Sequence, residues 1–419
     1  MLLKIRKYLP KIKKYILDNR VDVITGAVAV VVVMLASIML FGGNSSDENK
    51  EDLSKDAFGQ VVSGEIENET SKDAEQVAGT QIGIEATTEE QTTSLTYEDL
   101  NLVMYASESL NVRDLPNEEG EIIGNLIEGK RVKITGRCNQ TDWYRISYGD
   151  GEGFVCHEYL VEECPVSAPD IVAEAAILYD MDTCEVLYEK NADAKIYPAS
   201  VTKIMTTMLA CESGRLDEMI TFSQRCKEVP YDSSIYGVRV GESVTLRDSL
   251  YMLMLVSGND VGVGIAEHLS ANEAEFAALM TKRAKELGAK NTNFANSHGY
   301  HDENHYTTAR DMMFITLKAL TNEEFVKVWQ AAEYTVPKTN KVSYARKIVH
   351  THRMLRKDLS AYYPYALGGK TGFHDAAGRC CITTAKKDGR TLLCVTMKSN
   401  KTNQYKDGEK LFEYCFTYK

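Results

Sequence analysis

A long uncharged run near the N-terminus restricts this chain more than any other feature of its sequence. Residues 23–41 contain no charged side chain and are mostly Val, Ala, Leu, Ile and Met. As a helix, such a run covers about 30 Å, the thickness of the hydrocarbon core of a bilayer. All basic residues of this region precede the run, so the positive-inside rule predicts a cytoplasmic segment at 1–22 and a transmembrane helix at 23–41.

A cleaved signal peptide is the alternative interpretation of this run. Signal peptides have shorter apolar cores, of about 7–15 residues, and end in a pattern of small residues. The present run is longer and leads into Phe41-Gly42-Gly43-Asn44, which lacks that pattern. We therefore expect a single uncleaved anchor in the cell membrane, contacting the lipid bilayer, with the rest of the chain extracytoplasmic.

The formal net charge of −12 is unevenly distributed. Residues 43–100 contain fifteen Asp or Glu, three Lys, no Pro or Cys, and only two aromatic residues. A segment of this composition buries too little apolar surface to offset the entropy of ordering, which predicts a disordered acidic linker at 42–100. The acidic balance also excludes a generally basic nucleic-acid binder, so no nucleic-acid partner is expected.

Residues 101–163 change to short β-like runs separated by turn residues. The predicted strands are 110–114, 121–126, 131–137, 142–148 and 151–160. This segment resembles the bacterial SH3-type domain in its stretches Leu110-Asn111-Val112-Arg113, Trp143-Tyr144-Arg145-Ile146 and Gly153-Phe154-Val155. The resemblance implies a small all-β barrel of a kind that commonly binds cell-wall peptides or glycan. The alternative is that Trp143 and Tyr144 are only half-buried barrel residues.

A disulfide bridge between Cys138 and Cys156 is also expected within this segment.

Residues 169–419 have the length of one mixed α/β domain. Two strands around an Asp-containing turn are predicted at 175–180 and 185–190. The predicted helices are 200–213, 246–256, 260–269, 273–287 and 308–320, and strands return near 377–386 and 391–398. This order of elements predicts a sheet covered by helices.

Three short motifs follow one another in this domain, and the first suits nucleophilic catalysis. Ser200 and Lys203 open a helical run, and their i, i+3 spacing places them on one face of it. A serine hydroxyl is a weak nucleophile until a base takes its proton. A lysine that burial or a neighbouring cation keeps unprotonated is such a base.

The other two motifs carry groups that suit substrate binding. In the Ser-Gly-Asn motif at 257–259, the Ser257 hydroxyl suits proton relay to a leaving group, and the Asn259 amide suits a substrate carbonyl. In the Lys-Thr-Gly motif at 370–372, Lys370 and Thr371 suit recognition of a carboxylate, and the glycine permits close approach of an extended substrate. Each motif alone is common in helices, loops or strands, but the ordered set of three is specific.

The set S-x-x-K, S-x-N and K-T-G marks penicillin-binding proteins and serine β-lactamases. The flanking segments 197–206, 296–300, 305–312 and 368–378 further resemble the serine D-alanyl-D-alanine carboxypeptidases, which are low-molecular-mass penicillin-binding proteins. This resemblance implies an α/β (α+β) fold of the penicillin-binding-protein/β-lactamase-like transpeptidase type. It also implies a serine hydrolase that removes the terminal D-alanine from peptidoglycan stem pentapeptides through an acyl-enzyme. β-Lactam antibiotics are then expected as covalent inhibitors, and neither a cofactor nor a metal is implied.

The resemblance also implies roles for individual residues. The implied catalytic residues are Ser200 as the acylated nucleophile, Lys203 as its base, and Ser257. The implied substrate-binding residues are Asn259, Lys370, Thr371 and Gly372, with Lys370 and Thr371 at the terminal carboxylate. The implied oxyanion hole consists of the backbone N–H groups of Ser200 and Phe373.

The sequence departs from the family pattern at two points. Gly262 and Gly264 stand where small alanines are usual, which predicts a looser helix after Asn259. Little chain follows Tyr414, so the additional C-terminal domain and anchor of many relatives are not expected here.

Two other functions remain open on the sequence. A serine β-lactamase uses the same serine and lysine, but class A enzymes add a Glu that activates the deacylating water. No secure counterpart is evident between Asn259 and Lys370. A non-catalytic wall-binding or β-lactam-sensing ectodomain is the alternative of a different class, although only residues 1–22 would be available for cytoplasmic signalling.

A group of polar residues at 298–305 suggests a metal site at first sight. It contains His298, His301 and His305 with Asp302 and Glu303, but the spacing lacks the H-E-x-x-H pattern. The expected interpretation is a polar loop entering a helix that is capped at 308–311.

Overall fold

The computed structural model describes residues 94–419. The segments predicted at 1–22 and 23–41, and most of the acidic linker, lie outside the described residues. Within 94–419, no helix is long and apolar enough to span a bilayer. The predicted end of the linker at residue 100 is wrong, because strand β1 (Tyr97–Ala106) begins earlier. Its acidic residues conceal it in the sequence, but Asp99 lies 2.7 Å from the Arg145 guanidinium, which offsets its charge.

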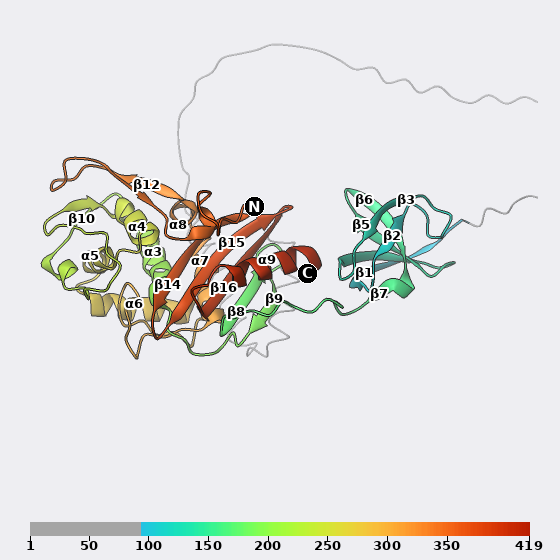
Figure 1. Cartoon of the computed structure of the whole chain (residues 1–419), viewed down its shortest axis with the longest axis horizontal. Coiled ribbons are helices and arrows are strands. Elements are labelled where there is room, and N and C mark those ends of the chain that lie inside the picture. Colours follow the sequence, from blue (N-terminus) through green and yellow to red (C-terminus); the bar gives the residue numbers. More distant parts are fainter. Residues whose placement is uncertain (1–93) are drawn as a thin grey trace, which may run out of the picture. The chain divides into compact units, whose positions relative to one another are not determined.

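The first unit is all β. Its strands are β1, β2 (Leu110–Arg113), β3 (Ile122–Leu126), β4 (Arg131–Cys138), β5 (Trp143–Tyr148), β6 (Gly151–Cys156) and β7 (Leu160–Val161), with a 3₁₀ turn η1 (His157–Tyr159) before the last. They form one sheet in the order β3-β2-β6-β5-β4-β1-β7 (Figure 1). The five predicted strands are confirmed, except that η1 divides the last of them. Alternate residues, among them Val112, Ile134, Ile146 and Val155, face a common core.

The expected bridge between Cys138 and Cys156 is wrong, since both thiols are free. Cys138 lies opposite Tyr97 in the β1–β4 pair, whereas Cys156 lies opposite Trp143 in the β5–β6 pair. The two cysteines therefore belong to different strand pairs of the sheet.

The second unit is built on a five-stranded antiparallel sheet in the order β14-β15-β16-β8-β9. Its strands are β8 (Ala175–Asp180), β9 (Glu185–Lys190), β14 (Ala366–His374), β15 (Gly378–Lys387) and β16 (Arg390–Ser399). The Lys-Thr-Gly motif at 370–372 lies within β14, at the edge of the sheet, which is a strand that the sequence does not predict.

Helices cover both faces of this sheet (Figure 1). They are α3 (Lys203–Glu212), α4 (Leu246–Leu255), α5 (Asn259–Leu269), α6 (Glu273–Glu286), α7 (Ala309–Ala319), α8 (Glu323–Gln330) and α9 (Lys406–Tyr418). Short elements complete the unit: η2 (Ala199–Thr202), η3 (Gln224–Lys227), η4 (Arg353–Leu355), and the pairs β10 (Met219–Thr221) with β11 (Ser243–Thr245) and β12 (Glu333–Val336) with β13 (Arg346–Val349).

The central strands are apolar on both sides because each face has its own core. On β16, Leu392 and Cys394 pack with α9, whereas Leu393, Val395 and Met397 belong to the larger core that includes α7. Successive side chains of a strand point to opposite faces, so one continuous apolar run supplies both cores. The helices α3, α4 and α5 of the larger core lie beyond the β14 edge (Figure 1). The first motif lies where η2 meets α3, and the second lies where the chain passes from α4 to α5.

Candidate active site

Ser200 and Lys203 are brought together where the turn η2 passes into α3. The Lys203 Nζ lies 2.9 Å from the Ser200 Oγ. Ala199, just before the serine, has φ of 49°, a conformation that costs a non-glycine residue of order 1–3 kcal/mol. The strain is local to the residue that presents Ser200 to the cleft.

Lys203 is fully buried and has two further oxygen neighbours. Its Nζ lies 2.7 Å from Asn259 Oδ1 and 2.6 Å from the backbone oxygen of His298. Burial first, and then the charge of Lys370, hold the Lys203 pKa well below its usual range. A neutral amine has two N–H donors and one lone pair. In that form its two donors would go to the oxygens of Asn259 and His298, which only accept, and its lone pair would face the Ser200 hydroxyl.

The second and third motifs meet opposite this pair. Lys370 donates to Ser257 Oγ at 3.1 Å and to the backbone oxygen of Thr371 at 2.8 Å. Ser257 has φ of 62°, so it too is held in the left-handed region. Burial lowers the Lys370 pKa to about 7, so this lysine changes charge near neutral pH.

Gly372 allows β14 to lie directly against the serine turn. A Cβ on this residue would come within 2.8 Å of the Ser200 N and 2.9 Å of the Pro198 O. Phe373 follows and is half exposed at the edge of the cleft. Ser200 and the residues 371–373 therefore line one continuous surface, as the sequence motifs predict.

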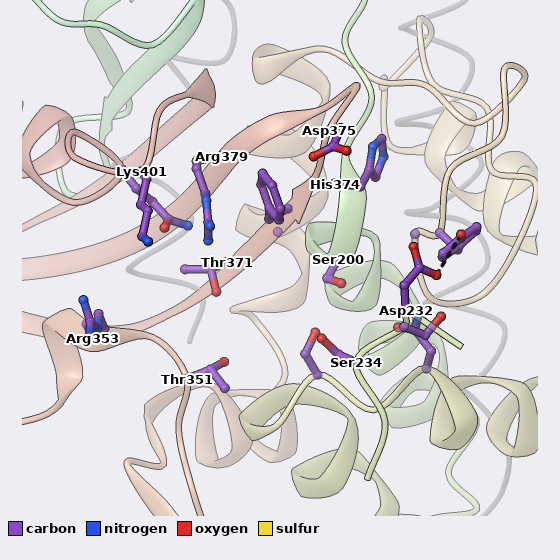
Figure 2. A pocket seen from close by; sticks show the side chains of 18 of the residues that line it. Ser200, Asp232, Ser234, Thr351, Arg353, Thr371, His374, Asp375, Arg379 and Lys401 are labelled. Carbon is purple, nitrogen blue, oxygen red and sulfur yellow. Dashed lines mark hydrogen bonds between the residues drawn. The ribbon is translucent and has the colours of Figure 1, made fainter. Parts of the chain in front are cut away.

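The cleft around these residues has a volume of about 540 Å³ and carries opposite charges on its two sides (Figure 2). Arg353, Arg379 and Lys401 lie on the side of Thr371, whereas Asp232 and Asp375 lie beyond Ser200. Within residues 94–419, none of the three cations forms an ion pair. Cations without carboxylate partners form a surface suited to an anionic group of a ligand.

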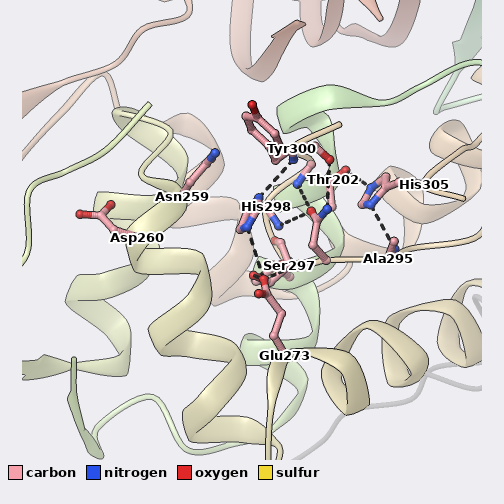
Figure 3. Close-up of polar contacts among 12 residues, drawn as sticks. Thr202, Asn259, Asp260, Glu273, Ala295, Ser297, His298, Tyr300 and His305 are labelled. Carbon is pink, nitrogen blue, oxygen red and sulfur yellow. Dashed lines mark hydrogen bonds and ion pairs between the residues drawn. The ribbon is translucent and has the colours of Figure 1, made fainter. Parts of the chain in front are cut away.

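The histidines near the site take part in hydrogen bonds within the protein (Figure 3). His298 Nδ1 accepts from the Tyr300 N–H at 3.1 Å, which leaves the proton on Nε2, 3.4 Å from Glu273 Oε1. His305 Nδ1 likewise accepts from the Ala295 N–H, at 3.1 Å, and its Nε2 contacts Thr202. Burial lowers the His298 pKa well below its usual range and that of His305 to about 3, so both rings are neutral.

These hydrogen bonds give the histidines of the 298–305 loop a structural role, because they hold the loop in place. Among the residues that the structure describes, no group of three or more His, Cys, Asp or Glu is arranged to hold a metal ion. The helix that follows is α7, and the Thr308 side chain caps it by accepting from the Asp311 N–H at 3.0 Å, as expected.

Comparison with known proteins identifies the domain that carries this site. The sequence model of the family described as D-alanyl-D-alanine carboxypeptidase matches residues 162–401, more than half of the chain. The chain belongs to the D-alanyl-D-alanine carboxypeptidase family. The bacterial SH3 domain model matches residues 108–161, the all-β unit.

Individual relatives of the carboxypeptidase-family domain agree with this assignment. The D-alanyl-D-alanine carboxypeptidase DacF of Bacillus subtilis is 34% identical over 252 residues, 58% of this chain and 62% of its own length. The D-alanyl-D-alanine carboxypeptidase of a Streptomyces species, strain K15, is 30% identical over 60% of this chain and 89% of its own length. The crystal structure of the Streptomyces K15 DD-transpeptidase superposes with a TM-score of 0.56 and 28% identity, covering 60% of this chain and 99% of that one. The chain thus spans about three-fifths of the length of the Bacillus relative.

The carboxypeptidase-family domain also contains site residues that the sequence did not reveal. Asp260 is buried and accepts from the N–H groups of residues 236–238, at 2.8–3.0 Å, and so fixes the loop that carries Asp232 into the cleft. The one signal in the sequence was its position directly after the Ser-Gly-Asn motif.

The sequence predicts a looser helix after Asn259 because of Gly262 and Gly264, but the structure does not show this loosening. α5 is unbroken, and a Cβ on Gly264 would come within 2.5 Å of the Phe222 ring, while one on Gly262 would lie 3.1 Å from His298 Cβ. These glycines allow α5 to pack closely against its neighbours, and the expected loosening is wrong for that reason.

Proposed function

We propose that this chain is a serine carboxypeptidase that removes the terminal D-alanine from peptidoglycan stem pentapeptides. The observation that carries the proposal is the buried Lys203, whose Nζ lies 2.9 Å from the Ser200 Oγ and contacts two further oxygens that can only accept. Family membership supplies the substrate class, because the relatives are named for D-alanyl-D-alanine carboxypeptidase activity.

In the proposed acylation step, Lys203 takes the Ser200 proton as Oγ attacks the carbonyl carbon of the penultimate D-alanine. The developing oxyanion is stabilised by the backbone N–H groups of Ser200 and Phe373. When the tetrahedral intermediate collapses, the C–N bond breaks and the leaving D-alanine nitrogen takes a proton from the Ser257 hydroxyl. Lys370, 3.1 Å from that hydroxyl, replaces the proton. The product is an ester between Ser200 and the shortened peptide.

Before the proposed deacylation, the proton that Lys203 took from Ser200 passes to solvent and Lys370 regains one from solvent, so both lysines return to their starting states. A water molecule then attacks the ester carbonyl as it gives a proton to the free Lys203 amine. Ser200 leaves as an alcohol, and the peptide leaves as a carboxylic acid. The Asn259 Nδ2, free of protein partners within the described residues, holds the acyl side of the substrate. Thr371, Lys370 and the three unpaired cations beside them hold the terminal carboxylate.

The same reaction accounts for covalent inhibition by β-lactam antibiotics, whose strained amide would acylate Ser200 in place of the peptide. The uncharged run at 23–41 supports a lipid-bilayer anchor, and the basic residues before it support a cytoplasmic N-terminus. The catalytic domain would then face the cell wall, with the bacterial SH3 domain contributing wall affinity.

The rival functions have less support. Among the cleft-lining residues that the structure describes there is no glutamate, the residue that a class A β-lactamase needs for deacylation. A non-catalytic sensing ectodomain gives no reason for a buried lysine of lowered pKa beside the serine. Transpeptidation is supported by one structural relative with that name, and it differs only in whether water or an amine takes the acyl group.

Product analysis on a defined stem pentapeptide tests the proposal. We expect the purified full-length chain in detergent to release one D-alanine per peptide, and labelled penicillin to form a long-lived adduct on the tryptic peptide containing Ser200. An added amine acceptor distinguishes transfer from hydrolysis. If the chain released no D-alanine and formed no penicillin adduct, the proposal would be contradicted. Rapid steady hydrolysis of penicillin would favour a β-lactamase.

The Lys370 pKa of about 7 predicts a pH dependence for substrate capture. The protonated form attracts the terminal carboxylate, so kcat/KM should fall as pH rises through the Lys370 pKa. Burial lowers the Lys203 pKa, so its free amine, the active form, persists to lower pH than the amine of an exposed lysine would. A peptide ending in an amide should show a smaller alkaline fall, because it has no carboxylate for Lys370 to attract and loses only the proton supply to Ser257. An identical fall for both peptides would contradict this assignment of Lys370.

A further inference from the structure

The direction of the substrate in the cleft follows from the proposed function, on which this inference rests. The terminal carboxylate lies at Thr371, and the attacked carbonyl lies between Ser200 and the N–H of Phe373. The earlier residues of the stem peptide must then continue along β14 toward its end at His374. A substrate strand on this path runs antiparallel to β14, with its N-terminal part at Asp375.

Each additional residue of an extended peptide advances about 3.3–3.6 Å. The third stem residue is bonded directly to the acyl D-alanine, so it lies one step beyond Ser200. This step brings it beside the part of the cleft formed by His374, Asp375, Asp232 and Tyr300, which we call the acidic end.

The acidic end is suited to a cation. Its two carboxylates belong to different segments of the chain, the loop between η3 and β11 and the turn after β14, and both line the cleft. Asp232 accepts from the Tyr300 hydroxyl at 3.0 Å, and Asp375 has no hydrogen-bond or ion-pair partner within residues 94–419. Among the described residues no lysine or arginine forms an ion pair with either carboxylate, although three unpaired cations lie on the opposite side of the same cleft.

Aromatic rings accompany the carboxylates. The His374 ring lies 5.0 Å from that of His301, which in turn meets the Tyr197 ring edge-on at 4.8 Å. Burial lowers the His374 pKa to about 4, so this ring is neutral and adds no positive charge beside Asp375. Aromatic surface next to a carboxylate accommodates both the methylene stem and the ammonium of a lysine-like side chain.

We infer that Asp232 and Asp375 select stem peptides whose third residue carries a free side-chain amine, and disfavour stems in which that amine is acylated. Both ends of the cleft then match the charges of one substrate: a carboxylate at the cationic side and an ammonium at the acidic end. The carboxylates act in binding and take no part in the chemical steps at Ser200.

Two pentapeptides that differ only at the third residue test this inference. One has L-lysine with a free ε-amine, and the other has the same residue Nε-acetylated. For the full-length chain we expect kcat/KM, measured from released D-alanine, to be about tenfold higher for the free amine, the ratio produced by one favourable charge pair of about 1.4 kcal/mol. In Asp375→Asn, Asp232→Asn and the double variant, this preference should shrink toward one because KM for the free-amine peptide rises.

Asp388→Asn is the matched control, since it removes the same charge at the turn after Lys387, the opposite end of β15 from the cleft. Asp388 has φ of 51°, a conformation that asparagine tolerates well. The control should retain the tenfold preference. Equal kcat/KM for the two peptides in the unmodified chain, or an unchanged preference in the double variant, would overturn the inference. A loss of kcat for both peptides with the ratio retained would mean a merely structural role and would also overturn it. No D-alanine from either peptide would instead contradict the proposed function itself.

Discussion

Replacing Lys203 by methionine is expected to lower the rate of Ser200 acylation by a factor on the order of 10³, because general-base catalysis typically contributes 10²–10⁴. Methionine is unbranched and close to lysine in length, so it fills the buried space without bringing a charge into it. The substitution removes the lone pair that faces the Ser200 hydroxyl and leaves the oxygens of Asn259 and His298 without their donor. The rate of labelling by a fluorescent penicillin measures acylation directly, without the later steps.

Lys285→Met is the control for this prediction. Lys285 is exposed on α6, so its loss removes one positive charge without touching the cleft. Its labelling rate should equal that of the unmodified chain, and a thermal melt of Lys203→Met should show a folded protein. Acylation of folded Lys203→Met within about tenfold of the unmodified rate would mean that another group takes the Ser200 proton.

The sequence predicts those parts of the fold in which local pattern and tertiary environment agree. The pair at 175–180 and 185–190 is found as β8 and β9, and the five predicted helices all exist within a few residues of their expected bounds. The helices α8 and α9 and the short pairs β10–β11 and β12–β13 were not predicted, and two missed strands, β1 and β14, have a common cause. β14 has three glycines among nine residues and β1 has adjacent acidic residues, so both have low strand propensity and are held in place by their neighbours in the sheet.

The residues of the candidate site divide in the same way, into those that local spacing reveals and those that only the folded chain brings together. The motif residues Ser200, Lys203, Ser257 and Lys370 are identified in the sequence because spacing along a helix or strand fixes their chemistry. Burial lowers the Lys203 pKa, and part of that enclosure comes from a distant backbone oxygen, that of His298, which no side-chain pattern in the sequence indicates. Arg353, Arg379 and Lys401 come from separate segments and meet only in the folded cleft. Long-range groups of this kind depend on the tertiary structure, which one sequence does not reveal.

Gly372→Ala is expected to lower acylation by about 10²–10³, comparable to removing one donor of an oxyanion hole. The added methyl would lie 2.8 Å from the Ser200 N and 3.1 Å from the Ala199 Cβ, where neither neighbour is the free end of a flexible side chain. β14 must therefore move away from the serine turn, and the N–H groups of Ser200 and Phe373 no longer converge on one oxygen. Both penicillin labelling and kcat for D-alanine release should fall.

Gly408→Ala provides the comparison, because the same methyl group at that position in α9 meets nothing closer than the Cys394 sulfur at 3.9 Å. Alanine is favoured over glycine in a helix interior by about 1 kcal/mol, so this variant should melt at a higher temperature and retain full acylation. If Gly372→Ala were acylated within about threefold of the unmodified rate while remaining folded, β14 could shift without cost to the reaction. The close contact of β14 with the serine turn would then be a matter of packing, and the oxyanion donors would have to be sought elsewhere in the cleft.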